Sequence, residues 1–450
     1  MNDEIRMSND ELPIGWAQSK IGNLCSLKNG RAFKPTEWTT SGLPIVRIQN
    51  LNNPKSSYNH FAGEPEPRYH LLGGELLFAW SGTPGTSFGA HVWRGAEAVL
   101  NQHIFRVDFD AENMDKRFFR YAINQKLDEL IDVEHGGVGL HHVTKGTFEG
   151  TEIKVPPLAE QKRIADKLEA VLGRVDACRA CLDRVPALLK RFRQSVLAAA
   201  TSGKLTEEWR MTNGVNDEWE NLKLGQLVAE PLRNGKSVRD GKGIPVLRLT
   251  ALRGGKFDWR EAKQGDWTGL DPTRFFVKDG DFLIIRGNGS QDLVGRGCLA
   301  ENPPDEMAFP DTLIRIRPDK DKLLPSYLVI VWNTSEVRSQ IEQAAKTTTG
   351  LWKVAQGDLE SISIPLPPLP EQQEIVRRVE DLFAFADRIE ARLATAQKTV
   401  ERLTPATLAK AFRGELVPQD LNDEPASTLL ERLRCPSDMT PAKAKRAKCS

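Results

Sequence analysis

The sequence lacks several features that would place a chain of 450 residues in a simple class. No apolar run approaches the roughly 18 residues of a membrane-spanning helix, so no transmembrane segment is expected. The N-terminus, MNDEIRMSNDELP, is polar and acidic, unlike a secretion signal, and the six cysteines are scattered. These absences predict a cytoplasmic protein in a reducing compartment.

An excess of positive charge is also missing, because the formal net charge is only +1. A protein that binds nucleic acid by bulk charge is usually strongly basic. If this chain binds DNA, its basic residues must gather on one face, or partners must supply further charge. The basic stretch at residues 441–448 lacks large apolar residues and is expected to be a flexible tail.

Motifs of catalysis are absent or incomplete. No Walker lysine motif occurs. Gly287-Asn-Gly289 resembles the start of a dinucleotide-binding fingerprint but lacks its third glycine. Asn302-Pro-Pro-Asp305 has an aspartate where the amino-methyltransferase motif has an aromatic residue that stacks on a flipped base. Glu152-Ile-Lys154 has no Pro-Asp pair upstream, which argues against a nuclease site. We therefore expect no catalytic residue in this chain.

Metal-binding patterns are equally incomplete. Cys178-x-x-Cys181 has no second pair at ligand spacing, and Cys178 falls on the apolar stripe of a predicted helix, so it is expected to be a small core residue. His141 and His142 lie in a glycine-flanked loop without partner ligands, which favours a polar contact role. No metal site and no bound cofactor are predicted.

An internal repeat dominates the organisation of the chain. The stretch from Val155 to Leu205 recurs from Leu366 to Leu416, and equivalent residues such as Pro157 and Pro368 are 211 positions apart throughout. In the part of the chain before each copy, equivalent residues are less regularly spaced. Pro44 and Pro245 are 201 positions apart, and the separation reaches 211 before the repeated stretch, so the second front part is ten residues longer. Insertions are tolerated in loops and are absent where length matters.

The front parts are predicted to mix strands and helices. Short β-branched and aromatic runs bounded by Gly and Pro indicate strands at 45–48, 75–80 and 104–107, repeated at 246–249, 281–285 and 313–316. Helices are expected at 115–131 and 326–341. The predicted fold is α+β, with front domains at 1–155 and 211–365, long helices at 156–210 and 366–420, and the tail at 421–450.

Apolar residues in the repeated stretches alternate gaps of four and three, which is the period of a left-handed coiled coil. The seam residues are Ile164, Leu168, Val171, Val175, Leu182 and Leu189 in the first copy, and Ile375, Val379, Leu382, Ile389, Leu393 and Val400 in the second. Antiparallel pairing of the two helices is favoured, although each helix could instead pack on its own front domain or on another subunit. Pro186 is expected to kink the first helix.

Polar loops that follow the predicted strands are the candidates for DNA contacts. Glycines allow close approach, and Arg, Asn, Gln, Ser and Thr hydrogen-bond base edges or phosphates. The candidates in the first front domain are Arg47, Gln49, Asn50, Trp80, Ser81, Thr83, Thr86, Asn101, Gln102, His103, His141, His142 and Lys145. Those in the second are Arg248, Thr250, Arg286, Asn288, Ser290, Gln291, Lys346, Thr347, Thr348 and Lys353.

The repeated helix starts PPLAEQKRIADKLEAVLGRVD and PPLPEQQEIVRRVEDLFAFAD, together with the two unlike front domains, resemble the specificity subunit of type I restriction-modification systems. The resemblance covers about residues 12–420. It implies two target recognition domains held apart by an antiparallel coiled coil, each reading one half of a split site on double-stranded DNA. It also implies two modification subunits, which methylate adenine, and two restriction subunits, which cut DNA. S-adenosylmethionine, ATP and Mg would belong to those partners.

Two functions of different classes remain open from the sequence. The first is a non-catalytic specificity subunit that recognises a bipartite, asymmetric DNA site and whose equal helices act as a ruler between the half-sites. The second is a coiled-coil scaffold that binds proteins without DNA specificity, which the near-zero net charge favours.

Overall fold

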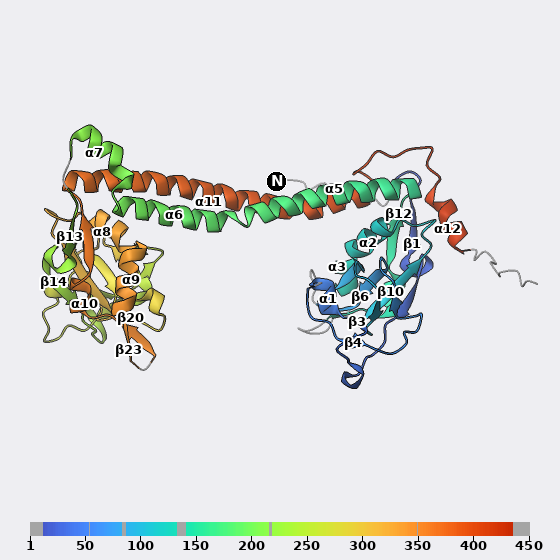
Figure 1. Ribbon diagram of the computed structural model, residues 1–450, viewed down its shortest axis with the longest axis horizontal. Helices are drawn as coiled ribbons and strands as arrows, with labels where there is room; N and C mark the ends of the chain where they lie inside the picture. Colours follow the sequence, from blue (N-terminus) through green and yellow to red (C-terminus); the bar gives the residue numbers. More distant parts are fainter. Residues whose placement is uncertain are drawn as a thin grey trace, which may run out of the picture. The chain divides into compact units, whose positions relative to one another are not determined.

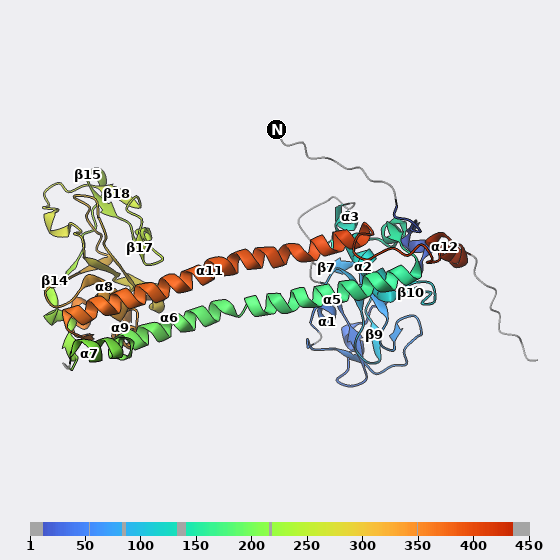
Figure 2. The same ribbon diagram turned by 90° about the horizontal axis from the view of Figure 1, so that it is seen from above.

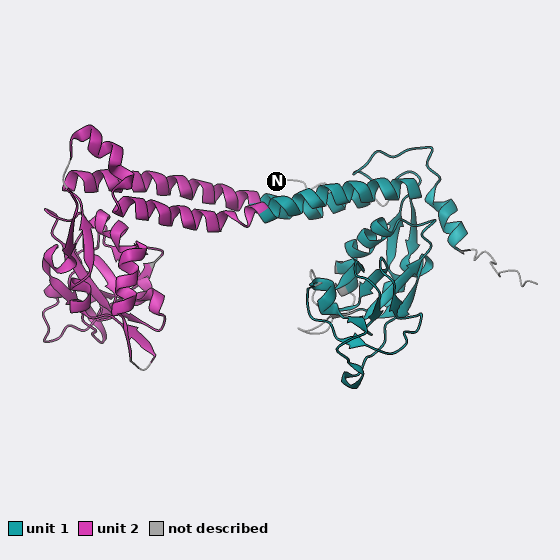
Figure 3. Cartoon of the chain, viewed as in Figure 1, with its two compact units in different colours: residues 1–180, 397–450 teal, residues 181–396 magenta. Residues whose placement is uncertain are grey.

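A computed structural model describes residues 12–53, 55–82, 87–132, 141–215, 218–348 and 350–434. The chain divides into two compact units, residues 1–180 with 397–450 and residues 181–396 (Figure 3). Each unit contains one front domain and parts of both long helices. The predicted domains at 1–155, 156–210, 211–365 and 366–420 therefore do not coincide with the compact units, which cut through both helices.

Unit 1 is built on two four-stranded sheets, an antiparallel sheet in the order β2-β10-β6-β8 and a mixed sheet in the order β4-β3-β9-β5. Its elements are β1 (Ala17–Lys20), β2 (Cys25–Asn29), β3 (Leu43–Val46), α1 (Ile48–Asn52), β4 (His60–Phe61), β5 (His70–Leu71), β6 (Leu76–Ala79), β7 (Ser81–Gly82), β8 (Gly89–Val92), β9 (Ala98–Leu100), β10 (Ile104–Phe109), α2 (Lys116–Gln125), α3 (Leu127–Asp132), β11 (His141–His142), α4 (Lys145–Gly150), β12 (Glu152–Val155), α5 (Leu158–Leu182) and α12 (Ala426–Arg434).

Unit 2 repeats the central antiparallel sheet in the order β14-β22-β19-β21. Its elements are α6 (Val185–Thr201), α7 (Glu207–Asn213), β13 (Glu220–Lys223), β14 (Val228–Asn234), β15 (Asp240–Leu247), β16 (Leu252–Arg253), β17 (Lys256–Phe257), β18 (Ala262–Gly265), β19 (Phe282–Ile285), β20 (Gly287–Asn288), β21 (Gly297–Leu299), β22 (Leu313–Pro318), α8 (Pro325–Trp332), α9 (Ser335–Ala344), β23 (Lys346–Thr348), β24 (Leu351–Lys353), α10 (Gln356–Glu360), β25 (Ser363–Leu366) and α11 (Leu369–Phe412), whose last part belongs to unit 1.

The central strands are buried on both faces because their side chains alternate between two cores. In β10, Phe105 and Val107 pack with α2 and the first long helix, whereas Ile104 packs with the β3–β9 sheet on the other face. In β22, Ile314 and Ile316 face α8 and the second long helix, whereas Leu313 faces the β15 side. The predicted strand and helix order is confirmed, although each predicted helix is divided in two, with a turn between α2 and α3 and another between α8 and α9.

A repeated glutamine fixes the start of each long helix on its front domain. The side-chain oxygen of Gln161 accepts a 2.9 Å hydrogen bond from the backbone N–H of Asp115, and its amide donates to the carbonyl of Pro156. Gln372 makes the same pair of bonds with Leu324 and Pro367. Both glutamines are fully buried, so the helix start and the sheet form one core.

Within each unit the long helices pair in antiparallel fashion, as predicted. In unit 2, Arg193 in α6 contacts Asp387 and Glu390 in α11, whereas Thr206, after the end of α6, contacts Glu371 at the start of α11. Figure 1 and Figure 2 both draw α6 beside α11. None of the twelve predicted seam residues is exposed; they are Ile164, Leu168, Val171, Val175, Leu182, Leu189, Ile375, Val379, Leu382, Ile389, Leu393 and Val400.

Pro186 interrupts the first helix, as predicted, but by a break rather than a bend. Helix α5 ends at Leu182 and α6 begins at Val185, with Pro186 in the first turn of α6, where its missing N–H is tolerated. The second copy continues unbroken through the equivalent region in α11. Cys178, about one turn before the end of α5, is exposed. The prediction of a buried Cys178 was therefore wrong.

The predicted flexible tail begins too early. Residues 426–434 form α12, and Ala426, Leu429 and Leu430 are buried in the core of unit 1. The backbone N–H of Ala426 donates to the carbonyl of Gly15, which ties this helix to the first strand of the chain. The basic stretch at 441–448 lies outside the described residues.

Candidate nucleic-acid interface

The loop after the central strand is paired, in both units, with the segment that precedes the long helix. In unit 1, β7 pairs with β11, with Ser81 opposite His142. In unit 2, β20 pairs with β24, with Asn288 opposite Trp352, and β23 extends this sheet. Candidate residues that lie about 60 positions apart in the chain are therefore brought together by an equivalent pairing in each unit.

Backbone hydrogen bonds around the loop repeat as well. The N–H of Val143 donates to the carbonyl of Trp80, and the N–H of Val354 donates to the carbonyl of Arg286, both at 3.0 Å. Trp80 N–H donates in turn to the carbonyl of His103, and Arg286 N–H donates to that of Thr312. The framework is the same in the two units, whereas the side chains that it presents differ.

In unit 1 the candidates line one edge of the front domain, where several strands end or begin. Val46 and Leu100 are parallel partners in β3 and β9, so Arg47 and Asn101 follow side by side. The N–H of Asn101 donates to the carbonyl of Val46. The His103 ring packs 5.2 Å from the ring of Trp80, and the exposed Gln102 amide lies 3.0 Å from the His103 Nε2 atom. We call the surface at these strand ends, which includes Arg47, Trp80, Asn101, Gln102 and His103, the recognition edge of unit 1.

The recognition edge of unit 2 has the same position and a more cationic composition. Arg248 follows β15 and is exposed, and Arg286 follows β19, with its guanidinium 3.4 Å from the carbonyl of Asp311. Lys346, Thr347 and Lys353 are exposed on β23 and β24. The loop after β19 contains Gly287 and Gly289, which have no side chains, so the loop is narrow. The structure thus places the second set of candidates on one surface of the second front domain.

Not every candidate side chain is available to bases. Asn50 is 1% exposed; its side-chain oxygen accepts from the N–H of Arg47, and its amide donates to the carbonyl of Ser57. Ser81 is 5% exposed. These two residues hold the edge together, so their prediction as DNA contacts is corrected.

Several other candidates are partly engaged within the domain. Gln291 donates to the carbonyl of Glu342, Asn288 accepts from the N–H of Ser290, and the Ser290 hydroxyl donates to Asp292. Thr250 donates to Glu261, and Lys145 pairs with Glu149 one turn along α4. Each is exposed or half-buried and retains further hydrogen-bonding capacity. Gln49 in unit 1 is also exposed, and its amide lies 3.5 Å from the carbonyl of Ser57. Their role in DNA binding stays a prediction.

Some predicted contacts cannot be placed. Thr83 and Thr86 lie outside the described residues. His141, His142 and Thr348 lie in described strands, but their side chains are not described.

A cation that the sequence reasoning missed lies on each recognition edge. Gly30 and Gly235 follow the edge strands β2 and β14, and a Cβ atom at either position would lie 2.1–2.2 Å from a backbone oxygen of the neighbouring strand end. Only glycine fits such an approach. The next residues, Arg31 and Lys236, are therefore carried to the edge. The repeated Gly-cation pair after the first sheet strand was the signal in the sequence.

The described part of the chain holds no group of three or more His, Cys, Asp or Glu side chains that could bind a metal ion. No described helix is both long enough and apolar enough to cross a membrane.

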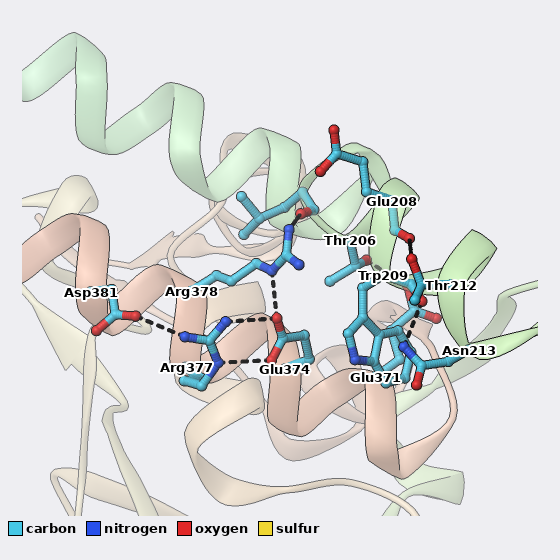
Figure 4. Close-up of polar contacts among 11 residues, drawn as sticks. Thr206, Glu208, Trp209, Thr212, Asn213, Glu371, Glu374, Arg377, Arg378 and Asp381 are labelled. Carbon is cyan, nitrogen blue, oxygen red and sulfur yellow. Dashed lines mark hydrogen bonds and ion pairs between the residues drawn. The ribbon is translucent and has the colours of Figure 1, made fainter.

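Some cationic residues on the long helices form ion pairs. Figure 4 shows Arg377 and Arg378 converging on the carboxylate of Glu374, at 2.8 and 2.6 Å. Hydrogen bonds from Arg377 and then Arg378 lower the pKa of Glu374 to about 2. Arg378 also donates to the carbonyl of Leu205, which joins the start of α11 to the end of the first helix.

Comparison with known proteins identifies the family. The chain matches the type I restriction modification DNA specificity domain twice, over residues 13–179 and 216–397. It is 32% identical to the type I restriction enzyme EcoKI specificity subunit of Escherichia coli K12, covering 95% of this chain and 97% of the relative. It is 31% identical to the StySPI specificity subunit of Salmonella potsdam, covering 95% and 96%.

Solved structures show the same fold. The HsdS subunit of Thermoanaerobacter tengcongensis matches with a TM-score of 0.60 at 20% identity, over 91% of this chain and 99% of that chain. A chain from a structure of a type I R-M system matches with a TM-score of 0.62 at 20% identity, over 90% and 100%. The resemblance noted in the helix starts is confirmed along nearly the whole chain, and the chain belongs to the family of type I restriction-modification DNA-specificity subunits.

Proposed function

We propose that the chain recognises a bipartite, asymmetric site on double-stranded DNA and directs adenine methylation, or ATP-dependent cleavage, by partner subunits. The observation that carries the proposal is the recognition edge, which recurs with one backbone framework and two different sets of side chains. Equivalent edges suit equivalent docking on two half-sites, and different side chains suit different bases. The scaffold alternative does not account for this repetition.

The partners follow from the family. A type I specificity subunit works in a complex with methylase and restriction subunits, and we propose two of each. S-adenosylmethionine, ATP and Mg would be bound by those subunits. The net charge of +1 suits a subunit whose partners share the phosphate contacts.

The equal helices support a second part of the proposal, in which helix length sets the number of unread bases between the half-sites. The offset of 211 positions holds from Pro157 to Gly203 and from Pro368 to Gly414 without an insertion. Inserting one heptad at matched positions of α5 and α11 keeps the seam in register. In a methylation assay the preferred spacer should lengthen while both half-sites stay the same; an unchanged spacer would refute the ruler.

The test of modular reading uses the full chain assembled with its modification subunits. Arg286→Ala, Asn288→Ala and Gln291→Ala are combined in one variant, and Gln102→Ala with His103→Ala in another. Methylation is measured on DNA libraries in which each half-site is varied independently. Each variant should change the base preference of one half-site only, and a different one. Gln373→Ala, at an exposed position on α11, is the control and should change neither. Loss of both half-sites in either edge variant would contradict modular reading.

A further inference from the structure

A cationic cleft lies on the second front domain, apart from the loops of its recognition edge. It is bordered by the edge strand β14, by β22 and by the turn at Thr273–Phe275, and it encloses about 210 Å³. Five of its lining residues are cationic: Arg233, Arg274, Lys278, Arg315 and Arg317. The only carboxylate among the lining residues described is Glu230.

Ion pairs inside the cleft leave positive charge uncompensated. Arg317 binds the buried Asp281 through two hydrogen bonds of 2.6 and 2.8 Å, and it also contacts Glu230 at 2.6 Å. Arg315, which is 3% exposed, shares Glu230 at 2.7 Å. Five cations thus face two carboxylates, a surplus of three.

Hydrogen-bond donors are also in surplus. The Nε atoms of Arg233 and Arg315 are buried without an acceptor in the described structure. Burial, reinforced by the neighbouring Arg317, lowers the pKa of Arg315. A buried cation without enough acceptors is costly, and a bound anion would supply both the charge and the acceptors.

Unit 1 has a less positively charged counterpart at the same place in its sheet, with two cations and one carboxylate. Arg106 occupies the position of Arg315, opposite Lys28 as Arg315 is opposite Arg233. The position of Arg317, however, is held by Asp108, which pairs with both Arg106 and Lys28. The same framework therefore carries a closed ion-pair cluster in one unit and an open cationic cleft in the other.

The surplus of charge and donors points to a phosphate oxyanion as the ligand of the cleft. We propose that the exposed Arg274 and Lys278, with Arg233 and Arg317, bind a backbone phosphate of the DNA that flanks the half-site of the second front domain, while the buried Arg315 adds its field from below. This assignment rests on the proposed function.

The position of the cleft supports DNA as the source of the bound phosphate. Thr312, beside Arg286 on the edge, and Arg315 are three residues apart along the chain, a rise of roughly 10 Å. The major groove is about 12 Å wide. A groove occupied by the recognition edge would thus bring a flanking phosphate to the cleft.

The test uses Arg274→Gln with Lys278→Gln in the full chain assembled with its modification subunits. Both side chains are exposed, so the fold should be kept, and an unchanged unfolding midpoint checks this. Affinity for a duplex carrying the methylated motif is measured across salt concentrations. The slope of log affinity against log salt should fall by about 1, and the preferred bases should stay the same. Lys320→Gln with Lys322→Gln removes equal charge from exposed positions outside the cleft and should leave the slope unchanged.

The ³¹P NMR line width of inorganic phosphate, measured in the presence of the full chain, shows whether the cleft binds free phosphate. This measurement distinguishes free phosphate from a DNA backbone phosphate as the source of the anion. No broadening, together with the reduced salt slope, supports the DNA source. Broadening that the double variant abolishes, with an unchanged slope, keeps the oxyanion site and overturns its DNA source. An unchanged slope and no broadening overturn the proposal. If the wild-type complex prefers no motif at all, the proposed function has failed; if it does prefer one, an unaffected slope is a failure of this inference alone.

Discussion

The indole N–H of Trp219 donates a 3.0 Å hydrogen bond to the carboxylate of Glu371, which has no exposed surface. Trp16 makes the equivalent 3.1 Å bond to Glu160 in the other unit. Each tryptophan lies just before the first strand of its front domain, and each glutamate lies in the first turn of a long helix. A buried hydrogen bond therefore joins the front domain to the start of the helix in each unit.

The surroundings of the two carboxylates differ: the guanidinium of Arg210 lies 3.5 Å from Glu371, and a threonine hydroxyl also contacts that carboxylate. Thr206 donates a 2.6 Å bond to Glu371, whereas the equivalent position in the other repeat is Val417. Thr206→Val should destabilise unit 2 by about 1.5–3 kcal/mol, because a buried charged acceptor loses a donor. Chemical unfolding of the full chain measures this. Thr212→Val removes an exposed hydroxyl bonded to the carbonyl of Glu208 (Figure 4) and should change stability by less than about 0.5 kcal/mol. Equal effects of the two substitutions would contradict the role of the buried bond.

The ion pairs of Glu374 should give a defined pH dependence. Its pKa is lowered from 4.5 to about 2 by Arg377 and Arg378, so its stabilising contribution is present above pH 4.5 and is lost as the pH falls toward 2. The difference in free energy of unfolding between wild type and Glu374→Gln should be constant at neutral pH and shrink below about pH 4.5. Unfolding titrations of both proteins over this range provide the measurement. A difference that persists unchanged to the lowest accessible pH would show that the carboxylate charge is not responsible.

The break between α5 and α6 should be removable. Pro186 cannot donate to the carbonyl of Leu182, so the amides around Arg184 and Val185 should exchange faster than those of the equivalent residues in α11. In Pro186→Ala this difference should disappear in a hydrogen-exchange measurement. Gln397, the counterpart of Pro186 in the second repeat, provides the internal reference. Rapid exchange that persists in the variant would place the cause of the break elsewhere in the chain.

Sequence patterns predicted the features that local periodicity and repetition encode. The heptad spacing identified the buried seam, and the aligned repeats identified strands such as β6 and β19 in order. The predictions that failed concerned residues whose burial depends on tertiary contacts. Cys178 has the spacing of a seam residue but is exposed, about one turn before α5 ends at Leu182. Leu429 and Leu430 form an apolar pair too short to suggest a helix until they pack on the first strand.

The candidate interface shows the same division. Residue type and position after a strand selected Arg248 and Lys353, which are exposed on the recognition edge. The same criteria selected Asn50, whose amide is used by the carbonyl of Ser57, seven residues away. No local pattern distinguishes an amide that reads a base from one that closes a loop, because both favour polar residues next to a turn.

The central claim is that two unlike recognition edges in one chain read two unlike half-sites. Single-molecule sequencing of DNA methylated by the assembled complex tests it most directly. We predict adenine methylation within one motif that has two different specified halves separated by a fixed number of unspecified bases. A single contiguous motif, or two identical halves, would contradict the account.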